Sequence, residues 1–171
     1  MKNKTIFVAC DSSNISKIKN ILKNLQNNKL KIIPKFGLQF FYSKNGRKFL
    51  ENYKSEYMLD IKASDIPQTI SSALYSIKDL KRIKYITVMA SVGLKGLKAF
   101  QKQARSINTS IICLGVTILT SLDNKSLREI GYKDKVEKLV LKQAALVKRA
   151  GIKGIVASGN EAKIIRKRFK N

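Results

Sequence analysis

The sequence predicts an α/β protein in which strands and helices alternate around a parallel sheet. Short apolar runs are each followed by a longer amphipathic stretch, and this order recurs about six times along the chain. Several of the short runs are rich in Ile and Val and lack strict alternation, which is typical of strands buried on both faces of a parallel sheet. The nine glycines and two prolines form no cluster that would mark a linker. We therefore expect a single domain over residues 1–171.

Six apolar runs are predicted to be the strands of this sheet. They are Thr5–Ala9, Leu30–Phe36, Tyr57–Ile61, Tyr85–Met89, Ile111–Ile118 and Gly154–Ala157. Connections between parallel strands are right-handed, so repeated strand–helix units form either a doubly wound sheet or a barrel. The pattern of apolar runs leaves both arrangements open.

Apolar residues spaced three and four apart predict amphipathic helices between the strands. The three stripes are Ile15, Ile18, Ile21, Leu22 and Leu25; Ile66, Ile70, Ala73, Leu74 and Ile77; and Leu139, Ala144, Leu146 and Val147. Ser12 or Ser13 is expected to cap the first helix, and Pro67 suits the first position of the second. The third helix is expected to end at Ala150-Gly151.

The composition excludes several kinds of catalytic and metal site. The chain has no histidine, which rules out Ser-His-Asp and Cys-His catalysis. Its two cysteines, Cys10 and Cys113, lie in separate apolar runs and are too few for a zinc site or a disulfide scaffold. We expect no metal. No apolar run approaches the ~18 residues of a membrane span, and Ile6–Ala9 is too short for a signal peptide, so we expect a cytoplasmic protein without a membrane partner.

The net charge of +24 raises the question of a nucleic-acid partner. Lysines outnumber arginines 28 to 7 and are spread along the chain. Lysine is a solvated point charge, whereas arginine suits the planar recognition of phosphates and bases. We therefore favour a generally basic, solvated surface. A basic nucleic-acid-binding module is the less favoured alternative.

Charged residues are predicted to gather at the carboxyl ends of the first three strands, where α/β proteins bind their ligands. They are Asp11, Lys35, Asp60, Lys62 and Asp65. Asp60 and Lys62 are two residues apart on one strand, so their side chains are expected to project to the same side. An alternating array of carboxylates and ammonium groups suits electrostatic catalysis. A structural salt-bridge network fits the same residues.

The sequence of residues 59–69 is Leu-Asp-Ile-Lys-Ala-Ser-Asp-Ile-Pro-Gln-Thr. It resembles the signature Asp-x-Lys-x-x-Asp-Ile-Pro-x-Thr of the orotidine 5'-phosphate decarboxylase family. Further blocks are similar to the family in the same order, at residues 8–11, 35–41, 115–123 and 150–158. The five blocks span nearly the whole chain, and it is therefore identified as a member of this family.

The resemblance implies a (β/α)8 TIM barrel, usually a homodimer, that acts without cofactor or metal. It implies the conversion of orotidine 5'-monophosphate to uridine 5'-monophosphate and carbon dioxide in de novo pyrimidine biosynthesis. By this likeness Asp60 lies beside the substrate carboxylate, and Lys62 supplies charge and a proton to the ring carbon. Asp65 is expected to reach the active site of the neighbouring subunit.

The same likeness implies the residues that bind the substrate. Asp11 and Lys35 are expected to hold the ribose hydroxyls. Thr69 and Thr120 are expected to contact the nucleotide.

The chain departs from the family pattern at individual positions. Ser64 stands where the family usually has a histidine before the second motif aspartate. Met89 stands where the fourth strand commonly ends in a histidine, and Val92 replaces an expected glycine. Neither histidine is the proton donor, so the chemistry is expected to survive these changes.

The chain also contains about six βα units, where the family has eight. The family continues to a Thr-Pro-Gly-Ile-Arg loop and a Gly-Arg segment that hold the phosphate, as barrels commonly do after their last two strands. Two alternatives follow. Either a second chain or a downstream reading frame supplies the last two βα units to the enzyme, or the chain is an inactive remnant of it.

Overall fold

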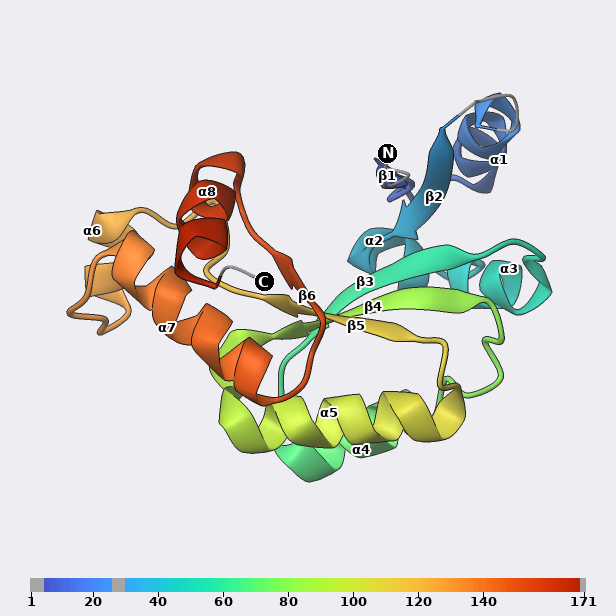
Figure 1. Cartoon of the computed structure of the whole chain (residues 1–171). Helices are drawn as coiled ribbons and strands as arrows, with labels where there is room; N and C mark the ends of the chain where they lie inside the picture. The colour runs from blue at the N-terminus through green and yellow to red at the C-terminus, as the bar shows by residue number, and fades with distance from the viewer. Residues whose placement is uncertain (1–4, 26–29, 170–171) are drawn as a thin grey trace. The chain divides into compact units, whose positions relative to one another are not determined.

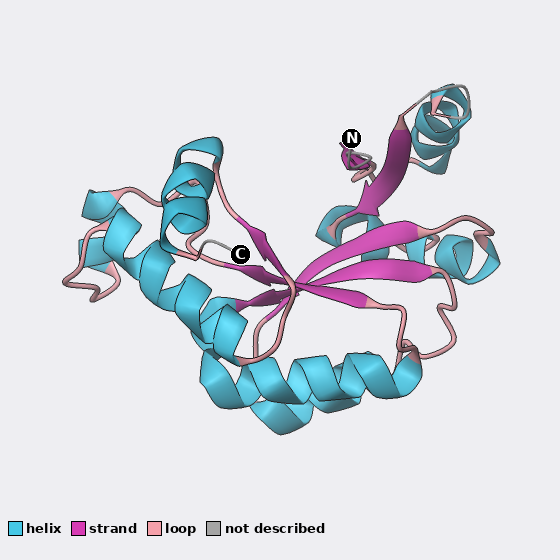
Figure 2. Cartoon of the chain, in the orientation of Figure 1, coloured by secondary structure: helices cyan, strands magenta, loops and turns pink. Residues whose placement is uncertain are grey.

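The computed structural model describes residues 5–25 and 30–169, in which six strands alternate with helices (Figure 1, Figure 2). The strands are β1 (Thr5–Ala9), β2 (Lys31–Phe36), β3 (Tyr57–Ala63), β4 (Ile83–Met89), β5 (Ile112–Val116) and β6 (Gly154–Val156). All six predicted strands are present, and their ends differ from the prediction by two residues or fewer. The pairs β1–β2, β2–β3 and β5–β6 are parallel.

The order of the strands decides between the two predicted arrangements. A doubly wound sheet reverses its strand order at a switch point, because the chain returns to the middle of the sheet. Here the order is β1-β2-β3-β4-β5-β6, without a reversal. This is the winding of a (β/α) barrel. The predicted fold class, a TIM-type α/β fold with about six βα units, is confirmed.

Helices follow the strands along the chain. They are α1 (Ile15–Asn24), α2 (Leu38–Phe41), α3 (Gly46–Asn52), α4 (Pro67–Tyr75), α5 (Gly93–Ile107), α6 (Asn124–Glu129), α7 (Val136–Arg149) and α8 (Gly159–Arg168), with a 3-10 turn η1 (Ala90–Val92) before α5. The three helices predicted from apolar spacing are α1, α4 and α7. Pro67 opens α4 as predicted. The C-cap of α7 is Ala150, and it is followed by Gly151, whose φ of 77° is the left-handed conformation that favours glycine.

The cap of α1 differs from the prediction. We expected Ser12 or Ser13, but the N-cap is Asn14, whose side-chain oxygen accepts a hydrogen bond from the Lys17 N–H at 3.1 Å. The Ser12 hydroxyl oxygen instead accepts from the Asn14 N–H at 3.2 Å. Serine and asparagine cap helices about equally well, so the residue types alone did not distinguish the three positions.

The chain divides into two compact units. The first consists of Met1–Ile61 and Ser76–Ile86, and the second of Lys62–Tyr75 and Thr87–Asn171. The single domain expected over residues 1–171 stays a prediction.

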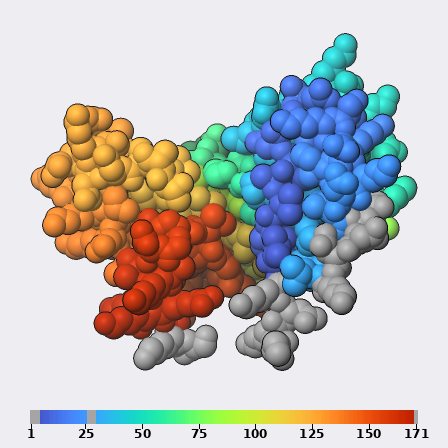
Figure 3. All heavy atoms as spheres, turned by 90° about the horizontal axis from the view of Figure 1, so that it is seen from above, coloured from blue at the N-terminus to red at the C-terminus, as the bar shows by residue number. Residues whose placement is uncertain are grey.

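The core of the first unit is a cluster of aromatic rings beside β2. The ring of Phe36 lies 4.9–6.2 Å, centroid to centroid, from those of Phe40, Phe49, Tyr53 and Tyr57. Phe36 and Phe40 are fully buried, and burial of such a side chain contributes roughly 1.5–3 kcal/mol. Figure 3 shows the atoms of β1 and α1 (dark blue) packed beside those of β2 (lighter blue).

The second unit has its helices packed in pairs. Helices α4 and α5 lie side by side (Figure 1), and α7 contacts both α5 and α8. A separate apolar cluster joins the segment after β5 to α6 and α7, and it consists of Ile118, Leu127, Leu139 and Val140. At the start of α8, Ser158 and Glu161 form a capping box, which fixes where the chain turns after β6.

Candidate active site

Lys35 and Asp60 form an ion pair at the carboxyl ends of β2 and β3. Lys35 Nζ donates a hydrogen bond to Asp60 Oδ2 at 3.3 Å. The register explains this contact, because Lys35 pairs with Met58, and Asp60, two residues further on, lies on the same face of β3 as Met58. The side chains are 27% and 11% exposed, so the two charges are partly shielded from water and attract each other more strongly than an exposed pair.

Asp11 is held at the end of β1 by the backbone that follows β2. Its Oδ1 accepts a hydrogen bond from the Phe40 N–H at 2.8 Å. The carboxylate also packs against Gly37, where an added Cβ would lie 2.3 Å from Asp11 Oδ2. The N–H of Cys10 donates to the Lys35 carbonyl at 2.8 Å, which fixes the neighbouring backbone. Asp11 is therefore a positioned carboxylate, and only glycine at position 37 leaves room for it.

Lys62 has an unusual backbone conformation for a strand residue. Its φ is 46°, and it is the one non-glycine residue with positive φ in the described part of the chain. Its N–H donates to the hydroxyl of Thr87 at 2.9 Å, and Thr87 is fully buried. A left-handed conformation costs a residue with a side chain about 1–3 kcal/mol, and such strain concentrates at functional sites.

This conformation changes one argument made from the sequence. The expectation that Asp60 and Lys62 project to the same side assumes an extended backbone, because side chains alternate only there. With φ at 46°, the spacing of two residues no longer sets the direction of the Lys62 side chain.

Asp65 and Thr69 lie at the start of the segment that leads from β3 into α4. Asp65 is exposed, and its Oδ1 accepts a hydrogen bond from the N–H of Ile66 at 2.7 Å. Thr69 is exposed on the first turn of α4. Ile66 is itself 65% exposed, so this turn presents an apolar side chain next to a carboxylate.

Thr120 lies in the segment between β5 and α6. It is exposed, whereas Thr117 in the same segment is fully buried and donates its hydroxyl to the Val156 carbonyl at 3.4 Å. Asp123 ends the segment by capping α6, and its Oδ1 accepts from both the N–H and the hydroxyl of Ser126 at 2.8 Å. These hydrogen bonds lower the pKa of Asp123.

The predicted site residues are divided between the two units. The first unit carries Asp11, Lys35 and Asp60, and the second carries Lys62, Asp65, Thr69 and Thr120. The structure brings Lys35 and Asp60 together as a contact pair. The catalytic and binding roles of all seven residues stay predictions.

Two residues of the site were missed in the sequence. Thr87 supports the conformation of Lys62, and Gly37 leaves room for Asp11. The signal for Thr87 was a hydroxyl inside an otherwise apolar run, and the signal for Gly37 was a glycine directly after a strand end. Neither signal is specific without the partner residue, which lies more than twenty positions away in the chain.

The described residues lack two other kinds of feature. No group of three or more Cys, Asp or Glu side chains among residues 5–25 and 30–169 is placed to hold a metal ion. The helices of the same part of the chain are each too short or too polar to cross a membrane.

The two cysteines are buried, and burial raises the pKa of both thiols, that of Cys113 to about 12.

The sequence matches one protein family over almost its full length. A family model with the description Orotidine 5'-phosphate decarboxylase / HUMPS family matches residues 4–171. The chain is 32% identical over 168 residues to orotidine 5'-phosphate decarboxylase of Carboxydothermus hydrogenoformans, covering 94% of this chain and 68% of the relative. It is 34% identical over 175 residues to the protein of the same name from Prochlorococcus marinus, covering 97% of this chain and 71% of the relative.

Solved structures give the same picture of the fold. The chain superposes on orotidine 5'-phosphate decarboxylase from Lactobacillus acidophilus with a TM-score of 0.85 and 26% identity, covering 98% of this chain and 77% of that one. An uncharacterized conserved protein from Geobacillus kaustophilus gives a TM-score of 0.84 at 26% identity, covering 96% of this chain and 78% of that one. The orotidine 5'-monophosphate decarboxylase of Methanocaldococcus jannaschii, complexed with the inhibitor BMP, shares the fold with a TM-score of 0.75 at 21% identity. The superposition covers 95% of this chain and 72% of that one.

Proposed function

Because the chain belongs to the orotidine 5'-phosphate decarboxylase / HUMPS family, whose decarboxylases are cofactor-independent carboxy-lyases, we propose that it converts orotidine 5'-monophosphate to uridine 5'-monophosphate and carbon dioxide. The observation that carries this proposal is the Lys35–Asp60 ion pair, which is followed two residues later by the strained Lys62. A plain salt-bridge network would need no left-handed lysine beside it.

Asp60 acts on the carboxylate that leaves the substrate. Its side chain is largely buried and carries a negative charge beside Lys35. Two carboxylates ~4 Å apart repel by about 4 kcal/mol at an effective dielectric constant of 20. Loss of carbon dioxide relieves this repulsion, so it favours the transition state over the bound substrate.

Lys62 acts on the charge that the reaction creates. The bond between the ring carbon and the carboxylate carbon breaks, and its electron pair stays on the ring carbon while carbon dioxide departs. The ammonium group of Lys62 attracts this pair and then gives it a proton. The amine takes up a proton from the solvent, so each turnover consumes one solvent proton. Such a preorganised charge needs no rearrangement during the reaction.

The other predicted residues position the nucleotide. Asp11 and Lys35 hold the ribose hydroxyls, and Thr69 and Thr120 contact the nucleotide. Asp65 completes the site of a second subunit in a homodimer. The fixed position of the Asp11 carboxylate, with Oδ1 on the Phe40 N–H, supports a binding role because a positioned acceptor loses little freedom when a ligand binds.

We further propose that a second chain supplies two more βα units, and with them the residues that bind the phosphate. The outermost strand β1 supports this, since Ile6 is 42% exposed and Phe7 37% exposed although the strand is apolar. Strands at the ends of the strand order present unpaired backbone groups that favour pairing with another strand. We expect the assembly in the cytoplasm.

The test is direct turnover of orotidine 5'-monophosphate, measured as uridine 5'-monophosphate formed. The chain is assayed alone and with a chain that carries the last two βα units of a relative. Two charged phosphate contacts, each worth ~1.5–3 kcal/mol, should raise nucleotide affinity by ~10²-fold or more on complementation. Absence of product from both folded preparations would identify the chain as an inactive relative.

A further inference from the structure

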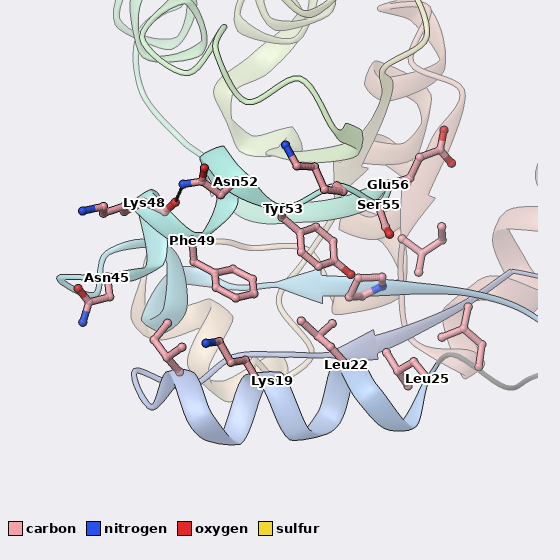
Figure 4. Close-up of a pocket in the computed structure, with 15 residues that line it drawn as sticks. Lys19, Leu22, Leu25, Asn45, Lys48, Phe49, Asn52, Tyr53, Ser55 and Glu56 are labelled. Atoms are coloured by element: carbon pink, nitrogen blue, oxygen red, sulfur yellow. Dashed lines mark hydrogen bonds between the residues drawn. The ribbon is translucent and has the colours of Figure 1, made fainter.

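A large pocket of the first unit lies outside the candidate active site. It has a volume of about 990 Å³ and lies between α1 and α3, beside β2 (Figure 4). None of the seven predicted site residues lines it. Ligand pockets in proteins commonly measure about 300–1,000 Å³, so the volume suits a small molecule.

The body of the pocket is apolar. Leu22 of α1 and Leu25 at its C-cap line one wall, and the rings of Phe49 and Tyr53 line the opposite wall (Figure 4). In the apolar stripe of α1 only Ile18 is fully buried, and the rest of the stripe is only partly covered by protein. Apolar surface left open in this way favours an apolar ligand.

One end of the pocket is positively charged. Lys19 projects from α1 towards α3, and Lys48 and Asn45 lie at the same end (Figure 4). Asn45 occupies the N-cap position of α3, but its side chain makes no capping hydrogen bond, so its amide is available to a ligand. Glu56, the acidic residue of the lining, is at the other end and pairs with Lys84 at 3.3 Å.

We propose that this pocket binds an anionic amphiphile, a molecule with a straight apolar chain and a carboxylate head. The chain lies along Leu22, Leu25, Phe49 and Tyr53, and the head contacts the ammonium group of Lys19. The charge of the lining selects an anion over a neutral molecule of the same length. The one carboxylate of the lining, Glu56, already pairs with Lys84, whereas the lining carries three lysines, Lys19, Lys48 and Lys54.

Calorimetry on the whole chain tests the proposal, with octanoate, decanoate and dodecanoate below their micelle concentrations as probes. The expected result is saturable binding of one molecule per chain, tightening about tenfold for each two methylenes added. Decanol, the neutral probe of matched length, should bind at least tenfold more weakly than decanoate.

Two lysines of α1 provide a matched pair of variants. Lys19 lines the pocket and Lys17 does not, although both are exposed. Lys19→Glu should weaken the binding of decanoate about tenfold or more and leave the binding of decanol unchanged. Lys17→Glu should change neither affinity by more than about twofold. Leu22→Trp should fill the pocket and weaken the binding of both probes. Leu22→Asp should weaken the binding of both probes by placing a charge in the apolar wall.

Circular dichroism and thermal unfolding confirm that each variant folds, and because Leu22 is only partly buried at least one of its two variants is expected to fold. Absence of decanoate and dodecanoate binding to the wild-type chain would overturn the proposal. Binding that survives both Leu22 variants would place the ligand elsewhere. Equal weakening of decanoate binding by Lys17→Glu and Lys19→Glu would show an effect of net charge alone. It would overturn the contact between the carboxylate head and Lys19.

Discussion

The Lys62 N–H donates a hydrogen bond to the hydroxyl of Thr87 at 2.9 Å, and this bond accompanies the left-handed backbone of Lys62. Thr87 is fully buried in β4, so its hydroxyl is shielded from water. A partly buried bond of this kind stabilises a conformation that the lysine would otherwise avoid. The backbone of Lys62, which we expect to protonate the substrate, is thus held by Thr87, 25 positions away in the chain.

Replacing Thr87 by valine keeps the shape of the side chain but removes the acceptor. The partly buried Lys62 N–H then loses this partner, and we expect Thr87→Val to lower the free energy of unfolding by about 1–3 kcal/mol and to reduce kcat. Urea unfolding and steady-state kinetics measure the two effects. Thr87→Ser keeps the hydroxyl and should remain close to wild type. A Thr87→Val variant that matches wild type in both measurements would contradict this role.

Lys62→Ala removes the proposed proton donor and the charge at the reacting carbon. We expect turnover of orotidine 5'-monophosphate to fall by about 10³-fold or more, because general acid catalysis and charge stabilisation are lost together. The fold should be retained, as judged by circular dichroism. Turnover at the wild-type level by this variant would refute the assignment of the reaction to Lys62.

Gly37→Ala tests the placement of Asp11. The new Cβ would lie 2.3 Å from Asp11 Oδ2, so the carboxylate must move and its bond to the Phe40 N–H must weaken. We expect KM for the nucleotide to rise about tenfold or more, with kcat less affected. Gly159→Ala is the control, since no atom lies within 4 Å of its added Cβ. Equal kinetics of the two variants would show that Asp11 does not bind substrate.

Mixing two inactive variants tests whether each active site needs two chains. If Asp65 acts in the site of the neighbouring subunit, a Lys62→Ala chain and an Asp65→Ala chain form hybrid dimers with one intact site. We expect part of the wild-type activity to return after subunits exchange. Exchange is verified with differently tagged chains, and no recovery in a mixture that has exchanged would place Asp65 in the site of its own chain.

The buried cysteines are expected to be unreactive in the native protein. Burial raises the pKa of Cys113 to about 12 and also raises that of Cys10, so both remain protonated thiols at pH 8 and thiolate is scarce. An aromatic disulfide reagent should modify both only on unfolding in denaturant. The control Ser72→Cys, at an exposed position of α4, should react within seconds. Rapid labelling of the wild-type native chain would contradict the burial of these thiols.

The sequence by itself determined the six strands, the βα order and the identity of the family. The strands and their order are local features, because apolar runs and turn residues indicate burial and chain direction within a few residues. The family follows from five motif blocks that occur in the same order along the chain. The start of α4 at Pro67 was likewise predictable, since the fixed φ of proline suits the first helical turn. The motif around Asp60 and Lys62 also predicted which residues react, and their catalytic roles stay predictions.

Only the tertiary structure decided how those residues are held. The backbone of Lys62 depends on Thr87, and the place of Asp11 depends on the missing side chain of Gly37, and both partners are distant in sequence. The contact between Lys35 and Asp60 follows from the register of β2 on β3, which no periodicity specifies. Pairing between distant segments is set by the packing of the whole sheet. An apolar pattern that repeats every two to four residues does not predict which residues of two strands pair.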